Sequence, residues 1–238
     1  MLASANFGFS PTAETALISV IVPIRGESVA SLENVRHLLA AGESELLVAS
    51  TPDGLKDACD WEAAGARLVP TEGTRGARLA GAVKSASGEV LFFLHADSRP
   101  HPDALARIRA AVAGGAAAGA FSLAYAGAGT ALAWVAAWAN LRSRLFRLPF
   151  GDQGLFCRRD AYAMAGGFRD MPVCDDLDFV RRIRRAGRFV ILPEKTVTSP
   201  RRFIENGVFR QGLRDWRVQL GYFAGVPPET LERWYNGK

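Results

Sequence analysis

The chain has 238 residues, of which 49% are hydrophobic and 22% charged, and its formal net charge is +5. This length suits one large α/β domain with a substantial core, and the composition is that of an ordinary globular protein. The three cysteines, Cys59, Cys157 and Cys174, exclude a disulfide framework, and no pair has metal-ligand spacing, so a reducing cytoplasm is the expected location.

The first hundred residues alternate between strand-like and helix-like segments. Short apolar runs predict buried strands at residues 16–24, 45–50, 66–70 and 89–94. Helical patterns separate them at residues 28–41, 55–64 and 76–87. No basic region precedes the first apolar run, so no signal peptide is expected. Strands that alternate with helices indicate right-handed βαβ units, and hence an α/β fold with a mostly parallel central sheet flanked by helices.

The fourth predicted strand ends abruptly in a polar tip, His95-Ala96-Asp97-Ser98. In an open α/β sheet, ligands bind just beyond the carboxyl ends of the strands. Asp97 is expected at that edge, where its carboxylate suits a hard divalent cation and the cation suits a phosphate. The other interpretation is that Asp97 caps a helix, because a helical pattern follows Pro100.

Residues 111–141 contain no charged side chain, yet they do not predict a membrane span. Glycines divide them into a helix end, a strand at residues 119–125 and a new helix from Thr130, so no continuous apolar run of ~20 residues remains. The new helix carries one stripe of Trp134, Trp138, Leu141 and Leu145, followed by Arg142, Arg144 and Arg147 around its end. Such a stripe is typical of a helix packed on its domain; peripheral contact with the inner face of a membrane is the alternative.

Arginine far outnumbers lysine, and its planar guanidinium matches phosphate oxygens bidentately. The arginines gather at three places: Arg75 with Arg78, residues 181–188, and Arg201 with Arg202. The sequence has no nucleic-acid recognition motif, so a small molecule that contains a diphosphate is the expected partner, and nucleic acid is not. Most of the run at residues 181–185 is expected to form a solvated helix face.

A second polar constellation lies in the C-terminal half. Gly151-Asp152-Gln153-Gly154 precedes a short predicted strand, and Gly166-Gly167-Phe168 marks a helix end. Asp175, Asp176 and Asp178 then open a helical pattern. Acidic residues in a first turn stabilise a helix through its dipole. Three carboxylates in four residues exceed that need, and one of them, facing a pocket, suits a general base.

These motifs follow one another in a fixed order: residues 19–23 with Glu27, Gly88-Glu89 leading to residues 94–98, then 151–154, 166–168 and Asp175-Asp176. In that order and spacing the chain resembles the family 2 glycosyltransferases of the GT-A fold, over residues 18–222. It is most similar to a small bacterial subgroup, the radical-SAM/selenodomain-associated transferase 2 proteins. The resemblance implies a single GT-A (Rossmann-like) domain at residues 16–238, after an N-terminal extension at residues 1–15. Residues 16–100 would form its nucleotide-binding half and residues 101–238 its acceptor-binding half.

The resemblance also implies roles for individual positions. A nucleoside-diphosphate sugar would be held by Pro23, Arg25, Glu27, Asp53, Arg75, His95, Asp97, Arg201 and Arg202, with Asp97 as the ligand of a Mg²⁺ or Mn²⁺ ion. Gly151, Asp152 and Gln153 fall where the donor sugar and the acceptor meet. Asp176 takes the place of the family's catalytic base, with Asp175 beside it. The implied reaction is an inverting transfer of the sugar to an acceptor that is either soluble or a lipid.

Two positions depart from the family's pattern. His95 replaces the first aspartate of an Asp-x-Asp motif, and the loop at residues 48–54 lacks the usual aspartate after the strand unless Asp53 replaces it. These departures leave open a degenerate sugar-nucleotide-binding or scaffold protein. A nucleotidyltransferase is a further alternative, but it normally needs a glycine-rich loop after the first strand, and residues 23–27 hold one glycine. The retained pair of Asp97 and Asp176 favours the glycosyltransferase.

Overall fold

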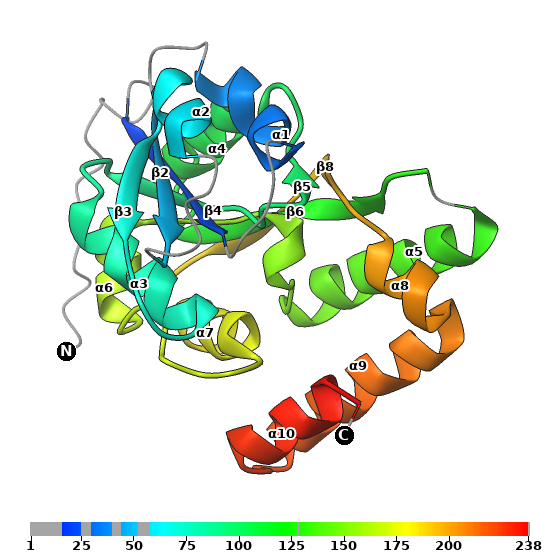
Figure 1. Ribbon diagram of the computed structural model, residues 1–238. Helices are drawn as coiled ribbons and strands as arrows, with labels where there is room; N and C mark the ends of the chain where they lie inside the picture. The colour runs from blue at the N-terminus through cyan, green and yellow to red at the C-terminus, as the bar shows by residue number, and fades with distance from the viewer. Residues whose placement is uncertain (1–15, 25–29, 40–43, 52–57, 128, 238) are drawn as a thin grey trace, which may run out of the picture.

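The computed structural model describes residues 16–24, 30–39, 44–51, 58–127 and 129–237 (Figure 1). Within these ranges, eight strands form one sheet in the order β3-β2-β1-β4-β7-β6-β8-β5. The strands are β1 (Ile18–Ile24), β2 (Ser44–Ser50), β3 (Arg67–Pro70), β4 (Val90–Phe93), β5 (Ser98–Arg99), β6 (Ala118–Tyr125), β7 (Leu155–Arg158) and β8 (Phe189–Thr198).

The sheet is mixed but mostly parallel. β3, β2, β1 and β4 run parallel to one another, and β6 runs parallel to β8. β7 is antiparallel to both β4 and β6, and β5 is antiparallel to β8. The predicted strands of the first half and the strand predicted at residues 119–125 are confirmed, and so is the α/β fold class. The two-residue strand β5 was not predicted.

Helices cover both faces of the sheet and create two hydrophobic cores. On one face lie α1 (Ala30–Leu39), α2 (Ala58–Ala63) and α4 (Ala104–Ala113); on the other lie α3 (Arg75–Ser85), α6 (Arg159–Met164) and α7 (Asp175–Ile183). Successive residues of a strand point to opposite faces, so Phe92 enters the first core and Phe93 the second. Burial on both faces explains why these strands are continuously apolar instead of alternating.

Four helices of the second half complete the structure: one packs beside β6, and the other three extend away from the sheet (Figure 1). They are α5 (Thr130–Phe146), α8 (Arg201–Asn206), α9 (Val208–Phe223) and α10 (Pro228–Tyr235). A small third core of Val173, Val218 and Leu231 fastens α9 and α10 to the segment that leads into α7. Among the described residues, no helix has the length and apolarity needed to cross a membrane.

Strand direction brings distant segments to one edge of the sheet. β1 and β4 are parallel neighbours, so Pro23 and the tip that begins at Leu94 lie at the same edge. β7 runs antiparallel to β4, with Leu155 opposite Phe93, so β7 begins where β4 ends. The 3₁₀ turn at Gly151–Gln153, just before β7, is therefore delivered to the carboxyl end of β4.

Candidate active site

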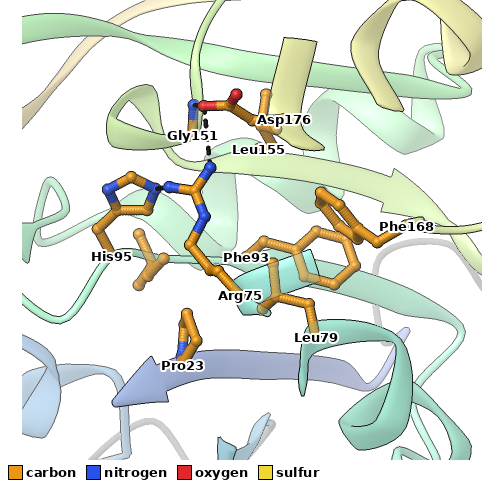
Figure 2. Close-up of a pocket in the computed structure, with 10 residues that line it drawn as sticks. Pro23, Arg75, Leu79, Phe93, His95, Gly151, Leu155, Phe168 and Asp176 are labelled. Atoms are coloured by element: carbon orange, nitrogen blue, oxygen red, sulfur yellow. Dashed lines mark hydrogen bonds and ion pairs between the residues drawn. The ribbon is translucent and has the colours of Figure 1, made fainter. Parts of the chain in front are cut away.

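Arg75, the first residue of α3, is the centre of a charged cluster at this edge (Figure 2). Its Nη2 and Nε donate to the two carboxylate oxygens of Asp175 at 2.6 and 3.0 Å. Nη2 also lies 3.3 Å from Oδ2 of Asp176, and Nη1 lies 2.6 Å from Nε2 of His95. One guanidinium thus joins α3, the tip of β4 and the first turn of α7.

His95 is a neutral hydrogen-bond acceptor in this cluster. An arginine can only donate, so Nε2 of His95 accepts and the ring proton is on Nδ1. Burial, together with the Arg75 guanidinium, lowers the pKa of His95 to about 3. His95 therefore supplies neither a negative charge nor an oxygen atom to a ligand at this position.

Asp176 is held as an ionised carboxylate. Its Oδ2 accepts from the Gly151 N–H at 2.8 Å, and its Oδ1 accepts from the Leu177 N–H at 2.8 Å. Burial alone would raise the pKa of Asp176, but the Arg75 guanidinium and these backbone donors outweigh burial and lower it below the usual range. For the neighbouring Asp175, burial prevails over Arg75 and raises the pKa.

The turn at Gly151–Gln153 is packed too tightly to shift. A β-carbon on Gly151 would lie 2.5 Å from Nε2 of His95, so this position has room only for glycine. Gln153 is fully buried: its Oε1 accepts from Ser143 Oγ at 2.8 Å, and its Nε2 donates to the Phe121 carbonyl at 3.0 Å. Gln153 thus anchors the turn to β6 and α5, and Asp152 is the side chain that the turn leaves without such bonds.

Asp152 and Arg142 are half-buried residues whose side chains carry buried, unused hydrogen-bonding atoms. Oδ1 of Asp152, and Nε and Nη2 of Arg142, have no hydrogen-bond partner among the described residues. Burial, then the charge of Asp176, raises the pKa of Asp152 to about 7, although the Arg142 guanidinium opposes this. Arg142 itself lies over the Phe150 ring, 3.7 Å from its centre. Unused polar atoms at a buried position are candidates for ligand contacts.

Asp97 lies at the exposed end of the β4 tip. Its Oδ1 accepts from Thr198 Oγ1 at 3.4 Å. The interpretation of Asp97 as a helix cap is wrong, because β5 follows it and α4 begins only at Ala104.

Asp97 is also the predicted ligand of a divalent cation. In the part of the chain that the structure describes, no three His, Cys, Asp or Glu side chains are grouped to hold a metal. A single carboxylate nevertheless fits Mg²⁺ or Mn²⁺ when the cation takes its other ligands from phosphate and water.

The other residues predicted to bind the donor do not all lie in the Arg75 cluster. Pro23 lines a cavity of about 10 Å³ together with Arg75, His95 and Asp176 (Figure 2); this volume holds about one water molecule, not a sugar. Arg202 donates to the Tyr235 hydroxyl and lies over that ring, 4.1 Å from its centre, whereas Arg201 is exposed. Arg25, Glu27 and Asp53 lie outside the described residues.

Two features of the arginine distribution differ from expectation. The run at residues 181–185 is only partly solvated, because Arg182 pairs with Asp178 at 2.6 Å. Arg142 was predicted only as part of a basic cluster at a helix end, yet its side chain turns inward beside Asp152.

The contact of Tyr235 with Arg202 could not be predicted from any local sequence pattern, since the two residues are 33 positions apart.

Sequence comparison finds no relatives: no protein-family model matches the chain, and no curated protein matches it. Solved structures do match in fold. A mannosyltransferase, PcManGT from Pyrobaculum calidifontis in complex with GDP-Man and Mn²⁺, superposes with a TM-score of 0.58 at 18% identity, over 85% of this chain and 61% of that one. This chain thus spans less than two thirds of that protein.

Glucosyl-3-phosphoglycerate synthase from Mycobacterium tuberculosis, in complex with Mn²⁺, UDP and phosphoglyceric acid, gives a TM-score of 0.58 at 19% identity. The match covers 91% of this chain and 81% of that one. The same enzyme with Mg²⁺ and UDP gives 0.56 at 18% identity, over 91% and 82% of the two chains. At these identities the likeness establishes the fold: the chain has a GT-A-like α/β architecture, structurally similar to nucleotide-sugar-dependent glycosyltransferases.

Proposed function

We propose that this protein is an inverting glycosyltransferase that moves a sugar from a nucleoside-diphosphate sugar to an acceptor hydroxyl. The observation that carries the proposal is the convergence of Asp97, Asp152 and Asp176 with Arg75 and Arg142 at the carboxyl edge of a GT-A-like sheet. Ligands of open α/β sheets bind at this edge. We assign the chain to the radical-SAM/selenodomain-associated transferase 2 subgroup as part of the same proposal.

The donor would bind between Pro23 and the tip of β4, with Arg201 and Arg202 toward the diphosphate. Asp97 would hold a Mg²⁺ or Mn²⁺ ion, which when bound offsets the charge that develops on the leaving diphosphate. We include Arg25, Glu27 and Asp53 in the proposed donor site because of their positions in the sequence alone. His95 contributes through Arg75: as a neutral acceptor it orients the guanidinium that holds Asp175 and Asp176.

The chemical step would be a single displacement. The acceptor oxygen forms a bond to the anomeric carbon, the bond from that carbon to the diphosphate oxygen breaks, and the electron pair leaves with the diphosphate. The acceptor proton passes to a carboxylate. Asp176 is our choice for this base because it is ionised at neutral pH, and Asp152 is the second candidate because its Oδ1 is unpaired and its pKa is about 7.

Arg142 would contact the acceptor. Its Nε and Nη2 have no hydrogen-bond partner in the described part of the chain, and they lie on the Asp152 side of the cluster. A guanidinium with two unused donors suits an oxygen-rich acceptor.

A protein that binds a sugar nucleotide without turnover is the second candidate, and the loss of an acidic side chain at His95 favours it. Binding and turnover can be separated. Nucleoside diphosphates should raise the melting temperature in the presence of Mn²⁺, since a ligand of the folded state stabilises it. Asp176→Asn should keep this shift while transfer falls by about 10²-fold or more.

Asp160→Asn is the matched control, because Asp160 is an exposed partner of Arg158 and follows the end of β7 that is opposite to the cluster. It should change neither binding nor transfer. If no nucleoside diphosphate shifts the melting temperature, the proposal fails. If nucleotides bind but no nucleotide sugar is turned over or hydrolysed, the binding protein is correct. A transfer product with the donor's own anomeric configuration would contradict the inverting step.

A further inference from the structure

The outer face of α9 is a continuous apolar stripe that none of the described residues covers. Phe209, Leu213, Trp216, Leu220 and Phe223 are all exposed, and Phe209 is 82% exposed. Their spacing of four, three, four and three residues places them on one side of an α-helix. A solvated helix would place polar residues there, so this stripe requires a partner.

A second stripe, on α5, continues the first. Trp134, Trp138, Leu141 and Leu145 are exposed, and Trp134 is 74% exposed. The expectation that this stripe packs on the domain is therefore wrong. The two helices meet where the Trp138 and Trp216 rings stack, with their centres 5.8 Å apart, and where Arg142 donates to Gln219. We call the two stripes together the α5–α9 face (Figure 1).

The charges beside the α5–α9 face are almost all positive. Exposed arginines flank it: Arg144 and Arg147 at the end of α5, and Arg210 and Arg217 on α9. α5 contains no acidic residue. The one acidic residue of α9, Asp215, is partly buried and accepts a hydrogen bond from Gln211 at 2.7 Å. The face thus combines aromatic and aliphatic side chains with a cationic border.

We propose that the α5–α9 face docks the protein on the surface of an anionic lipid bilayer. Tryptophan and phenylalanine favour the interface between headgroups and acyl chains, and each nearby arginine is attracted by anionic headgroups. A second copy of the chain fits less well, because a two-fold interface places the same patch on both sides and would bring arginine against arginine. The inference does not depend on the proposed function, since lipid binding needs no sugar transfer.

The docked orientation has a consequence for the site. Arg142 belongs to α5, but its guanidinium lies over Phe150 beside Asp152, on the inner side of the helix. The Asp152 side of the cluster is therefore separated from the lipid surface by one helix. An acceptor anchored in the bilayer would reach the site from this direction.

The test is cosedimentation of the full chain with vesicles of phosphatidylcholine, with and without phosphatidylglycerol. We expect binding to the anionic vesicles that weakens as salt is added. Leu213→Ser with Leu220→Ser should reduce that binding at least tenfold, because two apolar side chains no longer enter the interface. Arg210→Gln with Arg217→Gln should reduce binding to anionic vesicles but not to neutral ones. Met164→Ser is the matched control: Met164 is 61% exposed on α6, away from the face, and its loss should change nothing.

Three results would overturn the proposal. The wild-type chain could leave both kinds of vesicle unbound, or the double serine variant could bind like the wild type. Alternatively, sedimentation velocity without lipid could find a wild-type dimer that the double serine variant converts to a monomer, which would make the α5–α9 face an interface between copies. Circular dichroism of each variant excludes loss of fold as the cause.

Discussion

Replacing Arg75 by alanine should destabilise the protein by about 3 kcal/mol at pH 7. The substitution removes the cation from Asp175, whose side chain is only 4% exposed, and from Asp176 at 16%. Removing one partner of a buried ion pair costs about 3–5 kcal/mol, and the partial exposure of Arg75 itself favours the lower end. For a chain of this size the melting temperature should fall by about 6–12 °C.

The loss should depend on pH in a defined direction. Without Arg75, the pKa values of Asp175 and Asp176 in the folded state rise, because burial and mutual repulsion lose their strongest opponent; at Asp176 only the backbone donors and His95 still oppose them. The deficit is therefore full above the raised pKa values, shrinks as pH falls through them, and vanishes only well below the unfolded value of about 3.9, where both carboxyl groups are protonated in the folded and the unfolded state.

Urea unfolding of the wild type and of Arg75→Ala at pH 7 and at pH 5 measures both effects. Arg158→Ala is the control, because its pair with Asp160 is largely solvated and should contribute about 0–1 kcal/mol. A loss for Arg75→Ala no larger than the control's, or one that grows on acidification, would refute the buried-pair reasoning.

Three further outcomes are expected. Asp97→Asn should keep the melting temperature but abolish the Mn²⁺-dependent affinity for a nucleoside diphosphate in calorimetry; unchanged affinity would remove Asp97 from the metal site. With Asp176 as base, kcat/KM should stay level down to about pH 5, since the base loses its ionised form only below its own pKa; a fall that begins near pH 7 would assign the base to Asp152, whose pKa is about 7. Gly151→Ala should lower stability by about 1–3 kcal/mol in thermal unfolding because its β-carbon collides with His95. Gly212→Ala, in open space on α9, should not lower it, and equal effects would contradict the packing argument.

The parallel half of the sheet could be predicted because strands that are buried on both faces have continuously apolar sequences. β1 and β4 are apolar at nearly every position since both of their faces are covered, and the expected strands agree with the observed ones within two residues. β5, a polar pair of residues, has no such apolar sequence. Ser98 and Arg99 form a strand only because Thr198 and Val197 lie opposite them, a hundred positions further along the chain.

The residues of the site could be predicted from the sequence, but the contacts among them could not. The sequence indicated Arg75 as a phosphate ligand, since arginine matches phosphate oxygens, but a carboxylate presents a similar pair of oxygens. Only the fold decides that Asp175 and Asp176 receive this guanidinium in the structure described. The stripe on α5 has the same limit: its spacing is identical whether the helix is covered or exposed, and only the position of the other elements decides.

The place of β7 in the sheet has a consequence for how the chain is made. β4 carries the tip with His95 and Asp97, and its second neighbour, β7, emerges only after α4, β6 and α5 have been synthesised. Until then the apolar edge of β4 is unpaired, and such an edge recruits strands from other chains. A product that terminates before Leu155 would keep β1, β2 and β3 on one side of β4. The other side of β4, where β7 belongs, would have no hydrogen-bonding partner along its whole length. The strand that presents the site is thus also the strand through which an incomplete chain would aggregate.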